Sequence, residues 1–425
     1  MLLISAYFPP DTGSAAHLFY ELGAALVARG HRVAVVTGMP GYHAQGPLER
    51  YHGRLWLREG VEGMDVLRVA VPRPPRRVMV GRALWQLSSA AALFLGALRQ
   101  PRSDVAMVYS PPLPLGLSAW ALRRLRGTPF VLNVQDLFPR SVIDLGLLRS
   151  HAIIRLFEAL ERFVYRRATA IVVHSAGNRA HIVGKGAAVE KVAVVPNWVD
   201  TDFIRPGERM NGIRAQHGLG DAFVVSFAGV LGYAQDLDVV LEAARRLGDQ
   251  PAPGSRPLVW LIVGDGVEKP RLEQKARAMG LDNVRFLPMQ PRHAYPAVLQ
   301  ASDVSLTTLQ RSVRTPVVPS KIVSIMAAGR PVVAALDLGG DAPRLVAEAR
   351  CGLCVSAADA GALADAVLAL YRDPALCAEL GHSGRRYAEE HLSLAACAAR
   401  YEALFRDIVA RRAGKMHVAP GHDRV

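Results

Sequence analysis

Cysteine is scarce in this sequence of 425 residues. The four cysteines all lie in the last quarter of the chain, at Cys351, Cys354, Cys377 and Cys397. So few cysteines exclude a disulfide-stapled scaffold and fit a reducing cytosol. Cys351 and Cys354 have the CxxC spacing, but no second pair or histidine follows at the spacing of a zinc site. We therefore expect both to be small buried residues where a helix meets a strand.

Long apolar runs are also missing. A stretch of sixteen uncharged residues at 83–98 is bounded by Arg82 and Arg99. As a helix it would span about 24 Å, which is shorter than the ~30 Å hydrocarbon core of a bilayer. We therefore expect a buried or interfacial helix. The first residues lack the basic segment and the cleavage site of a signal peptide, so a cytoplasmic protein is expected.

Negative charge is scarce in the first half of the chain. Residues 1–200 contain 24 Lys+Arg and 13 Asp+Glu, a net charge of +11, whereas the remainder contains 27 and 24, a net charge of +3. Nucleic acid and anionic lipid are both candidate partners for such a surface. No basic run interleaved with aromatic residues occurs, so we expect an anionic membrane surface and no nucleic acid.

Two stretches combine arginines with an apolar helical face. In 151–167 the apolar face has the spacing of a helix that packs on a sheet, and we favour that packing. In 73–102 three arginines precede the uncharged stretch, and we favour contact with the membrane surface.

The length and the hydrophobic content of 51% predict two packed domains of about 200 residues each. Short apolar runs alternate with amphipathic helical stretches, which predicts doubly wound parallel sheets. In the first half we predict strands at 2–6, 32–36, 104–108, 130–134, 170–173 and 191–195. In the second half we predict them at 224–228, 259–263, 284–287, 303–307 and 332–335.

The alternation breaks at 196–206, where two prolines and several turn residues indicate a domain junction. We therefore predict one Rossmann-like domain at 1–198, a second at 199–392, a C-terminal helix at 393–412 and a loose tail at 413–425. We expect the two domains to face each other across a cleft, with the C-terminal helices crossing back to the first. Ligands would lie at the carboxyl ends of the strands.

The segment 318–331 has the pattern of an anion site. It predicts a short helix with Ser320 as its N-cap and Gly329 at its end, followed by a strand. Lys321 adds a full charge at the positive end of the helix dipole, which suits a diphosphate. An ordinary αβ unit with a solvated lysine would show the same pattern. Gly13, before the first helix, would also let the backbone approach a ligand.

Eight short motifs occur in order along nearly the whole chain. They are Tyr7-Phe-Pro-Pro with Gly13, Gly30-His-x-Val33, Val134-Gln-Asp-Leu-Phe-Pro139, Val195-Pro-Asn-Trp-Val-Asp200, Phe227-Ala-Gly229 with Gln235, Ile262-Val-Gly-Asp-Gly266, Asn283-Val-x-Phe-Leu287, and Pro319-Ser-Lys321 with Gly329-Arg-Pro331. As a set they resemble the family 4 (group 1) retaining glycosyltransferases of GT-B fold. The resemblance is greatest to the branch that transfers N-acetylfucosamine-type sugars in bacterial O-antigen and capsule synthesis.

This resemblance implies a UDP-sugar donor, held by the second domain, and an acceptor held by the first. It implies transfer with retention of the anomeric configuration, without a metal or a cofactor, to a polyprenyl-diphosphate-linked saccharide at the inner face of the cytoplasmic membrane. The implied donor-binding residues are Gly13, Gly229, Gln235, Gly264, Phe286, Leu287, Ser320, Lys321 and Ser324.

The resemblance also implies two catalytic residues, Lys321 and Asp136. Lys321 would stabilise the leaving diphosphate, while Asp136 would orient the acceptor or stabilise charge in the transition state. A helix N-cap is an equally good interpretation of Asp136. His174 would contact the acceptor, although a structural histidine fits its position better. Asp265 has the pattern of a turn aspartate, with backbone near Phe286 and Leu287 reading the uracil.

The sequence departs from the family at the donor site. The Glu-x7-Glu signature is replaced by Pro316 and Ser324, and a hydroxyl makes one weaker hydrogen bond where a carboxylate makes two. Many members have basic residues after the first strand of the second domain. This chain has Val230 and Gln235 at those positions, and Arg311 or Arg314 could compensate.

Three functions are therefore compared. The first is a glycosyltransferase of cell-surface polysaccharide synthesis. The second is a UDP-sugar epimerase, for which no acid–base pair of carboxylates stands out at the strand ends. The third is a catalytically degenerate GT-B paralogue that acts as a binding or assembly partner, which the two missing glutamates would suit.

Overall fold

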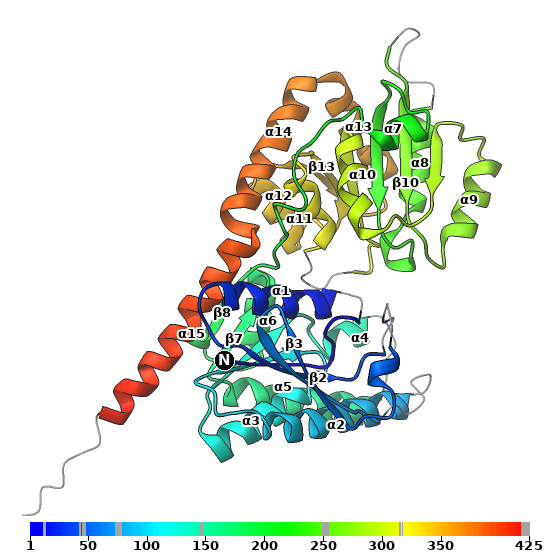
Figure 1. The fold of residues 1–425 in the computed structure, drawn as a ribbon. Helices are drawn as coiled ribbons and strands as arrows, with labels where there is room; N and C mark the ends of the chain where they lie inside the picture. The colour runs from blue at the N-terminus through cyan, green and yellow to red at the C-terminus, as the bar shows by residue number, and fades with distance from the viewer. Residues whose placement is uncertain are drawn as a thin grey trace, which may run out of the picture. The chain divides into compact units, whose positions relative to one another are not determined.

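The computed structural model describes residues 1–11, 14–41, 44, 48–72, 79–144, 148, 150–248, 255–313, 316 and 318–417 (Figure 1). The chain forms two compact α/β units. The first comprises Met1–Asn197 together with the segment from Cys397 onward, and the second comprises Trp198–Ala396. The division falls one residue before the boundary predicted from sequence.

The first unit contains an eight-stranded sheet in the order β3-β4-β2-β1-β5-β6-β7-β8. Neighbouring strands are parallel except for β3 and β4, which form an antiparallel hairpin. The strands are β1 (Leu2–Ser5), β2 (Ala34–Gly38), β3 (Trp56–Val61), β4 (Met64–Val69), β5 (Ala106–Ser110), β6 (Phe130–Val134), β7 (Ala170–Val173) and β8 (Val192–Val194).

Helices cover both faces of this first sheet. They are α1 (Ser14–Ala28), α2 (Met79–Ala97), α3 (Leu115–Arg126), α4 (Arg140–Asp144), α5 (His151–Arg167), α6 (Ala176–Gly184) and α15 (Leu394–His417), with 3-10 turns at Glu49–Tyr51 and Val189–Lys191. α2, α3 and α5 share one core with Leu2, Ile4 and Val108 of the strands. On the opposite face, Phe19 of α1 packs against Tyr109, and Tyr401 of α15 accepts a hydrogen bond from Asn133 at 2.6 Å.

The second unit contains a six-stranded parallel sheet in the order β11-β10-β9-β12-β13-β14. Its strands are β9 (Phe223–Ala228), β10 (Leu258–Val263), β11 (Val284–Leu287), β12 (Val304–Thr308), β13 (Val332–Leu336) and β14 (Gly352–Ser356). β10 has the sequence LVWLIV and every residue in it is buried, as expected for a central parallel strand covered on both faces.

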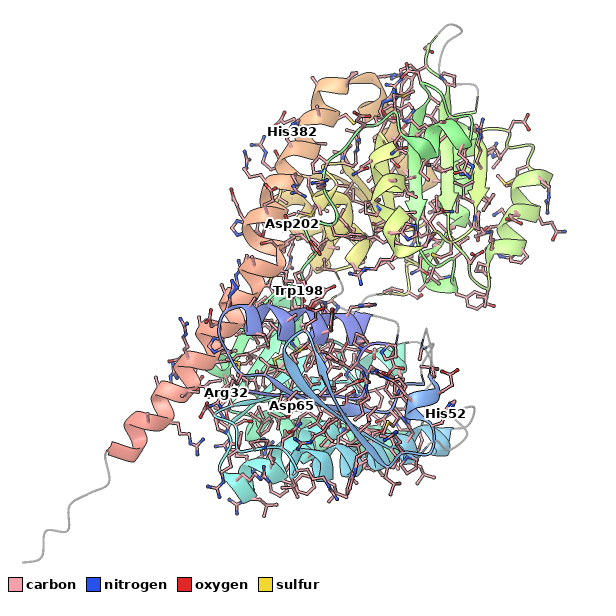
Figure 2. The ribbon with its side chains drawn as sticks, in the orientation of Figure 1. Arg32, His52, Asp65, Trp198, Asp202 and His382 are labelled. Carbon is pink, nitrogen blue, oxygen red and sulfur yellow. The ribbon has the colours of Figure 1, made fainter. Side chains whose placement is uncertain are left out.

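Helices also enclose the second sheet. They are α7 (Gly212–Gln216), α8 (Asp238–Arg246), α9 (Lys269–Ala278), α10 (Tyr295–Ala301), α11 (Ser320–Ala327), α12 (Asp341–Glu348), α13 (Ala360–Arg372) and α14 (Pro374–Tyr387), with 3-10 turns at Tyr233–Gln235 and Arg292–Ala294 and a π turn at Ala388–Leu392. α8, α9 and α13 pack on one face, and α11 and α12 pack on the other. Trp198 and Asp202 lie on the segment that enters this unit (Figure 2).

The doubly wound parallel architecture predicted from sequence is confirmed in both units. Three predicted strands (130–134, 170–173 and 284–287) have the observed bounds. The hairpin β3–β4 was not predicted, because charged residues such as Arg58, Glu59 and Arg68 interrupt its apolar pattern. The terminal helix joins the first unit, and it extends to His417, beyond its predicted end.

Several predictions concern residues outside the described part of the chain. They are the donor-binding role of Gly13, the three arginines before the uncharged stretch (Arg73, Arg76 and Arg77), the compensating role of Arg314, and the end of the C-terminal tail beyond 417.

Candidate active site

The strand order of each sheet reverses at one point. In the second sheet, β9 to β11 run outward on one side, and the chain then returns to place β12 beside β9. In open α/β sheets such a reversal opens a crevice at the carboxyl ends of the two central strands, where ligands bind. The loops concerned begin at Gly229, after β9, and at Leu309, after β12. In the first sheet, the corresponding reversal lies between β1 and β5.

Glycines let two backbone segments pack closely at the second reversal. Gly229 and Gly264 have φ angles of +149° and +154°. A Cβ atom on Gly264 would lie only 1.8 Å from the Gly229 carbonyl oxygen. The amide of Gly229 donates to Val263 and that of Leu231 to Asp265, both at 2.9 Å. The predicted donor residues Gly229 and Gly264 are therefore brought into contact, and only glycine fits at 264.

Lys321 reaches the same place from the start of α11. A Cβ atom on Gly229 would lie 2.5 Å from Lys321 Cε, so the lysine side chain occupies the space that this glycine leaves open. Its Nζ lies 5.0 Å from the centre of the Phe227 ring, a cation–π contact. Within the described residues the ammonium has no carboxylate partner. Burial lowers the pKa of Lys321 below its ordinary value.

The start of α11 differs in one respect from the prediction. Ser320 is the first helical residue and not the N-cap; that position belongs to Pro319, and no side chain caps the helix. The first-turn amides of Ser320 and Lys321 form no hydrogen bond in the described part of the chain. The uncapped amides and the lysine therefore present positive charge together.

Ser324 lies one turn further along α11. Its side chain is hydrogen-bonded to the hydroxyl of Tyr295, the first residue of α10, whose pKa is raised by burial. The sequence analysis did not identify Tyr295. Pro296, at the second position of α10, is a sequence signal for a helix that begins at this edge of the sheet.

Gln235 closes the loop that follows β9. The backbone carbonyl of Gln235 accepts a hydrogen bond from Thr308 at the end of β12, and the amide of Gln310 donates to Ala234 at 2.9 Å. The loops after β9 and β12 are therefore tied to each other next to Lys321.

Phe286 and Leu287 lie at the end of β11, and the predicted contact of their backbone with the uracil stays a prediction. The Phe286 side chain is partly buried and packs against the core that contains α8 and α9 residues. The Leu287 carbonyl accepts from the Gly264 amide at 3.1 Å, so it supports the glycine loop. Asp265 pairs with Lys269 at 2.8 Å and accepts from the Met289 amide at 2.7 Å, which agrees with a turn aspartate.

Asp136 lies just beyond β6 in the first unit and is exposed. The protein packed around its carboxyl nevertheless raises the pKa of Asp136, an effect that the Ser141 hydroxyl and the Leu137 amide partly oppose. Asp136 is not the N-cap of α4, which begins four residues later at Arg140. Its negative charge also contributes to the raised pKa of buried Tyr109.

His174 follows β7, and its Nδ1 lies 2.9 Å from the side-chain amide of Asn178. Asn178 is buried on α6, and its backbone amide donates to Ser175, the N-cap of that helix. This arrangement agrees with the structural interpretation of His174.

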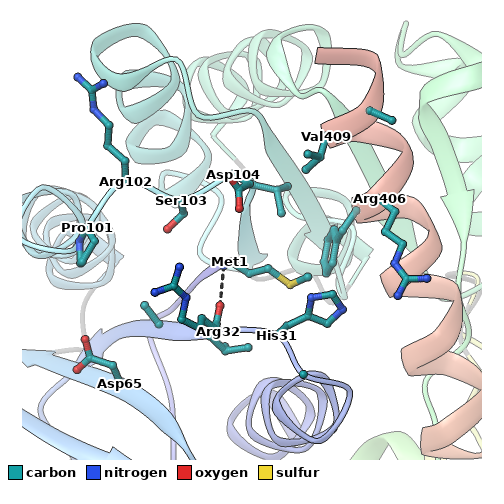
Figure 3. A pocket seen from close by; sticks show the side chains of 16 residues that line it. Met1, His31, Arg32, Asp65, Pro101, Arg102, Ser103, Asp104, Arg406 and Val409 are labelled. Carbon is teal, nitrogen blue, oxygen red and sulfur yellow. Dashed lines mark hydrogen bonds between the residues drawn. The ribbon is translucent and has the colours of Figure 1, made fainter. Parts of the chain in front are cut away.

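A cavity of about 680 Å³ lies elsewhere in the first unit. Met1, Arg32 and Asp104, at or before the starts of three strands, line it together with Val409 of α15 (Figure 3). It is therefore at the amino edge of the first sheet, and none of the predicted site residues line it. A smaller cavity of about 360 Å³ lies at the carboxyl edge of the second sheet, where Arg311 lines it with Asp337 and Ser356.

Among the described residues, no group of three or more His, Cys, Asp or Glu side chains is placed to hold a metal ion. Burial raises the pKa of the Cys351 thiol to about 12 and that of Cys354 to about 11. Cys351 lies between the end of α12 and the start of β14, and Cys354 is the third residue of β14. They are therefore neutral packing residues at a helix-to-strand junction, as predicted.

Comparisons with known proteins agree with this geometry. Residues 12–198 match the family model described as "Glycosyl transferase 4-like domain", and residues 210–387 match "Glycosyl transferases group 1". WcaI of Escherichia coli K12, a glycosyl transferase named for colanic acid biosynthesis, is 30% identical over 311 residues, covering 72% of this chain and 75% of WcaI. WbjE of Pseudomonas aeruginosa, named as a glycosyltransferase, is 27% identical over 286 residues, covering 66% and 70%.

Solved structures show the same fold. Anabaena Alr3699/HepE in complex with UDP superimposes with a TM-score of 0.71 at 17% identity, covering 96% of this chain and all of that one. WaaG, a glycosyltransferase involved in lipopolysaccharide biosynthesis, superimposes with a TM-score of 0.67 at 16% identity, covering 95% and 99%. With both domain models matched and two doubly wound units of GT-B type, the chain belongs to the group 1 glycosyltransferases, with a glycosyl transferase 4-like first domain.

Proposed function

We propose that this glycosyltransferase moves a sugar from a UDP-sugar to a lipid-linked saccharide in bacterial cell-surface polysaccharide synthesis. The observation that carries the donor assignment is the Lys321 ammonium, which has no anionic partner among the described residues and lies against Gly229 at the strand-order reversal. The similarity to Alr3699/HepE, solved with UDP, and to WcaI and WaaG, which are named for colanic acid and lipopolysaccharide biosynthesis, supports the same proposal.

In the proposed reaction the donor diphosphate lies against the start of α11. As the sugar–oxygen bond breaks, negative charge grows on the diphosphate, and Lys321 and the free first-turn amides stabilise it. Asp136 stands on the acceptor side, where its carboxylate orients the acceptor or stabilises positive charge on the sugar. The proposal includes retention of anomeric configuration and no metal requirement, with an N-acetylfucosamine-type sugar as the first donor to test.

The exposed side of α2 supports the proposed membrane contact. Leu84, Leu87 and Leu95 recur at helical spacing and are 54%, 55% and 52% exposed. α3 packs beside α2 through the Ser118 hydroxyl, which donates to the Ala90 carbonyl at 2.7 Å, and α3 carries Arg123 and Arg124. An apolar stripe beside arginines suits the surface of an anionic bilayer. No helix in the described part of the chain is long and apolar enough to span one.

The central test compares Lys321→Met with wild type in radiolabelled transfer from a panel of UDP-sugars to a membrane lipid extract. We expect the rate to fall about 10²- to 10³-fold, with UDP affinity weakened and the fold retained. Lys275→Ala is the control, because Lys275 pairs with Asp238 on α8, away from the reversal point. Wild-type transfer by Lys321→Met would contradict the donor site.

The same assay separates the other two functions. Formation of an epimer without acceptor would identify an epimerase. Binding of UDP without turnover of any donor would identify a degenerate paralogue. For the membrane, we expect Leu87→Gln/Leu95→Gln to reduce cosedimentation with phosphatidylglycerol vesicles, and Val189→Gln, an equally exposed apolar residue after α6, to leave it unchanged.

A further inference from the structure

Arg68 is a buried cation beneath the loop that follows β1. It lies near the end of β4 and is 1% exposed. Its Nε donates a hydrogen bond to Glu59 of β3, and its Nη2 donates to the carbonyl of Pro9 in the loop. Its third nitrogen, Nη1, is buried and has no hydrogen-bond partner. One guanidinium thus joins the edge hairpin to the loop.

Aromatic rings and a second arginine surround this group. The Arg68 guanidinium carbon lies 5.1 Å from the centre of the Tyr51 ring and 5.9 Å from that of Phe8. Arg50 donates to the Tyr51 hydroxyl at 2.8 Å and also to Glu59. Segments that follow β1 and β2 are therefore held against the same side chain.

Strand register places Arg68 in a polar row directly below the loop. Arg68 is opposite Thr37 of β2, and Thr37 is opposite Ser5 of β1. The Ser5 hydroxyl donates to the Tyr7 carbonyl at 2.8 Å, whereas the buried Thr37 hydroxyl has no partner. Above the row, Asp11 accepts from the Gly41 amide at 2.8 Å. The loop Tyr7–Asp11 is thus anchored by polar contacts at several points.

The anchored loop Tyr7–Asp11 lies at the expected ligand site of the first unit. β1 borders the strand-order reversal of the first sheet, so the loop lies where a ligand of this unit is expected. An incompletely hydrogen-bonded buried cation is a poor choice for stability alone, because apolar residues of similar volume pack without that desolvation cost. Its hydrogen bond to Pro9, however, fixes the direction of a loop carbonyl.

We propose that Arg68 is a positioning residue for the acceptor: it holds the loop Tyr7–Asp11 in the shape that receives the acceptor saccharide. The inference rests on the proposed transferase function and assigns acceptor recognition to this part of the first unit. Arg68 acts through the Pro9 carbonyl and makes no contact with the transferred sugar.

The test measures acceptor KM, UDP affinity and amide hydrogen exchange in Arg68→Met and Arg68→Lys. We expect Arg68→Met to raise acceptor KM about 10- to 100-fold, with UDP affinity unchanged and faster exchange in residues 7–11. Arg68→Lys, which keeps the charge, should recover part of the loss. Arg214→Lys is the matched control: Arg214 is also 1% exposed, but it lies in the second unit, bonded to Asp303 at 2.7 Å.

Unchanged acceptor KM and unchanged exchange in both Arg68 variants would overturn the inference. So would an equal rise in acceptor KM for Arg214→Lys, because the effect would then be general destabilisation. Failure of wild-type transfer with every donor would instead reject the proposed function. The exchange measurement still reports whether Arg68 holds the loop in that case, since it requires no turnover.

Discussion

The two sheets reverse strand order in the same way, yet the residues near the carboxyl ends of their strands differ in charge and backbone. In the second sheet, Gly229 and Gly264 pack backbone against backbone, and Lys321 carries a charge that no described group neutralises. In the first sheet, the buried cation Arg68 is already paired with Glu59, and Asp136 is exposed. The same topology therefore presents a lysine unpaired among the described residues of the second unit and an exposed carboxylate in the first, and our proposals for donor and acceptor start from this difference.

The largest expected effect comes from filling the glycine contact. Gly264→Ala places a Cβ atom 1.8 Å from the Gly229 carbonyl oxygen, at a φ angle that only glycine adopts readily. We expect the second unit to lose more than about 2 kcal/mol of stability and UDP binding to be abolished. Denaturant unfolding and calorimetry measure both. Gly212→Ala, where the added Cβ meets nothing within 4 Å, should be close to neutral.

The next largest effect on the transfer rate is expected at Asp136, the carboxylate that follows β6. Asp136→Asn should lower the transfer rate about 10²-fold without changing UDP affinity. Since the protein packed around its carboxyl raises the pKa of Asp136 above its ordinary value of 3.8, wild-type activity should begin to fall at a higher pH on acidification than a fully solvated aspartate would cause. A pH–rate profile of both proteins decides the point. An acidic limb that persists in Asp136→Asn would assign that limb to another group.

A smaller effect is expected on the number of protons that the protein takes up when UDP binds. Burial lowers the pKa of Lys321 in the free protein, and a bound diphosphate favours the ammonium, so binding should raise that pKa. UDP affinity should therefore decrease as pH rises through the lowered pKa, with protons taken up on binding in that range. Calorimetry in buffers of different ionisation enthalpy measures this uptake. Equal uptake by Lys321→Met would exclude Lys321 as its source.

The smallest effect is expected at Ser324. Ser324→Ala removes one hydrogen bond, to Tyr295, and should weaken UDP binding about 2- to 10-fold. Isothermal titration with UDP measures the change. If Ser324→Ala weakened UDP binding as much as Lys321→Met does, one hydrogen bond to Tyr295 would not explain the loss. The Ser324 hydroxyl would then be assigned a direct contact with the nucleotide.

Sequence alone predicted most of the architecture, since central parallel strands are continuous apolar runs. It could not predict the hairpin β3–β4, because charged residues interrupt the apolar pattern of its strands. Arg68 in this hairpin is buried where Glu59 and Pro9 accept its hydrogen bonds, and these contacts depend on the fold. Ser320 was assigned as an N-cap, a position that belongs to Pro319.

The predicted site is partly assembled by the fold. Lys321 and Gly229 are 92 residues apart, and their contact depends on β12 returning to the side of β9. The motifs contain both residues. Their spacing in the sequence, however, does not indicate that the Lys321 side chain occupies the space that Gly229 leaves open. Tyr295 was missed because a single tyrosine before a proline carries little signal without the neighbouring α11.

The course of α15 has a practical consequence for engineering. Residues from Cys397 onward complete the core of the first unit, where Tyr401 and Phe405 are each 1% exposed. The first unit is thus built from two separate pieces of polypeptide, with the second unit inserted between them. A chimaera that exchanges donor specificity between relatives therefore needs two crossovers, one near 197 and one near 396. A single crossover would combine the first sheet of one protein with the α15 helix of the other.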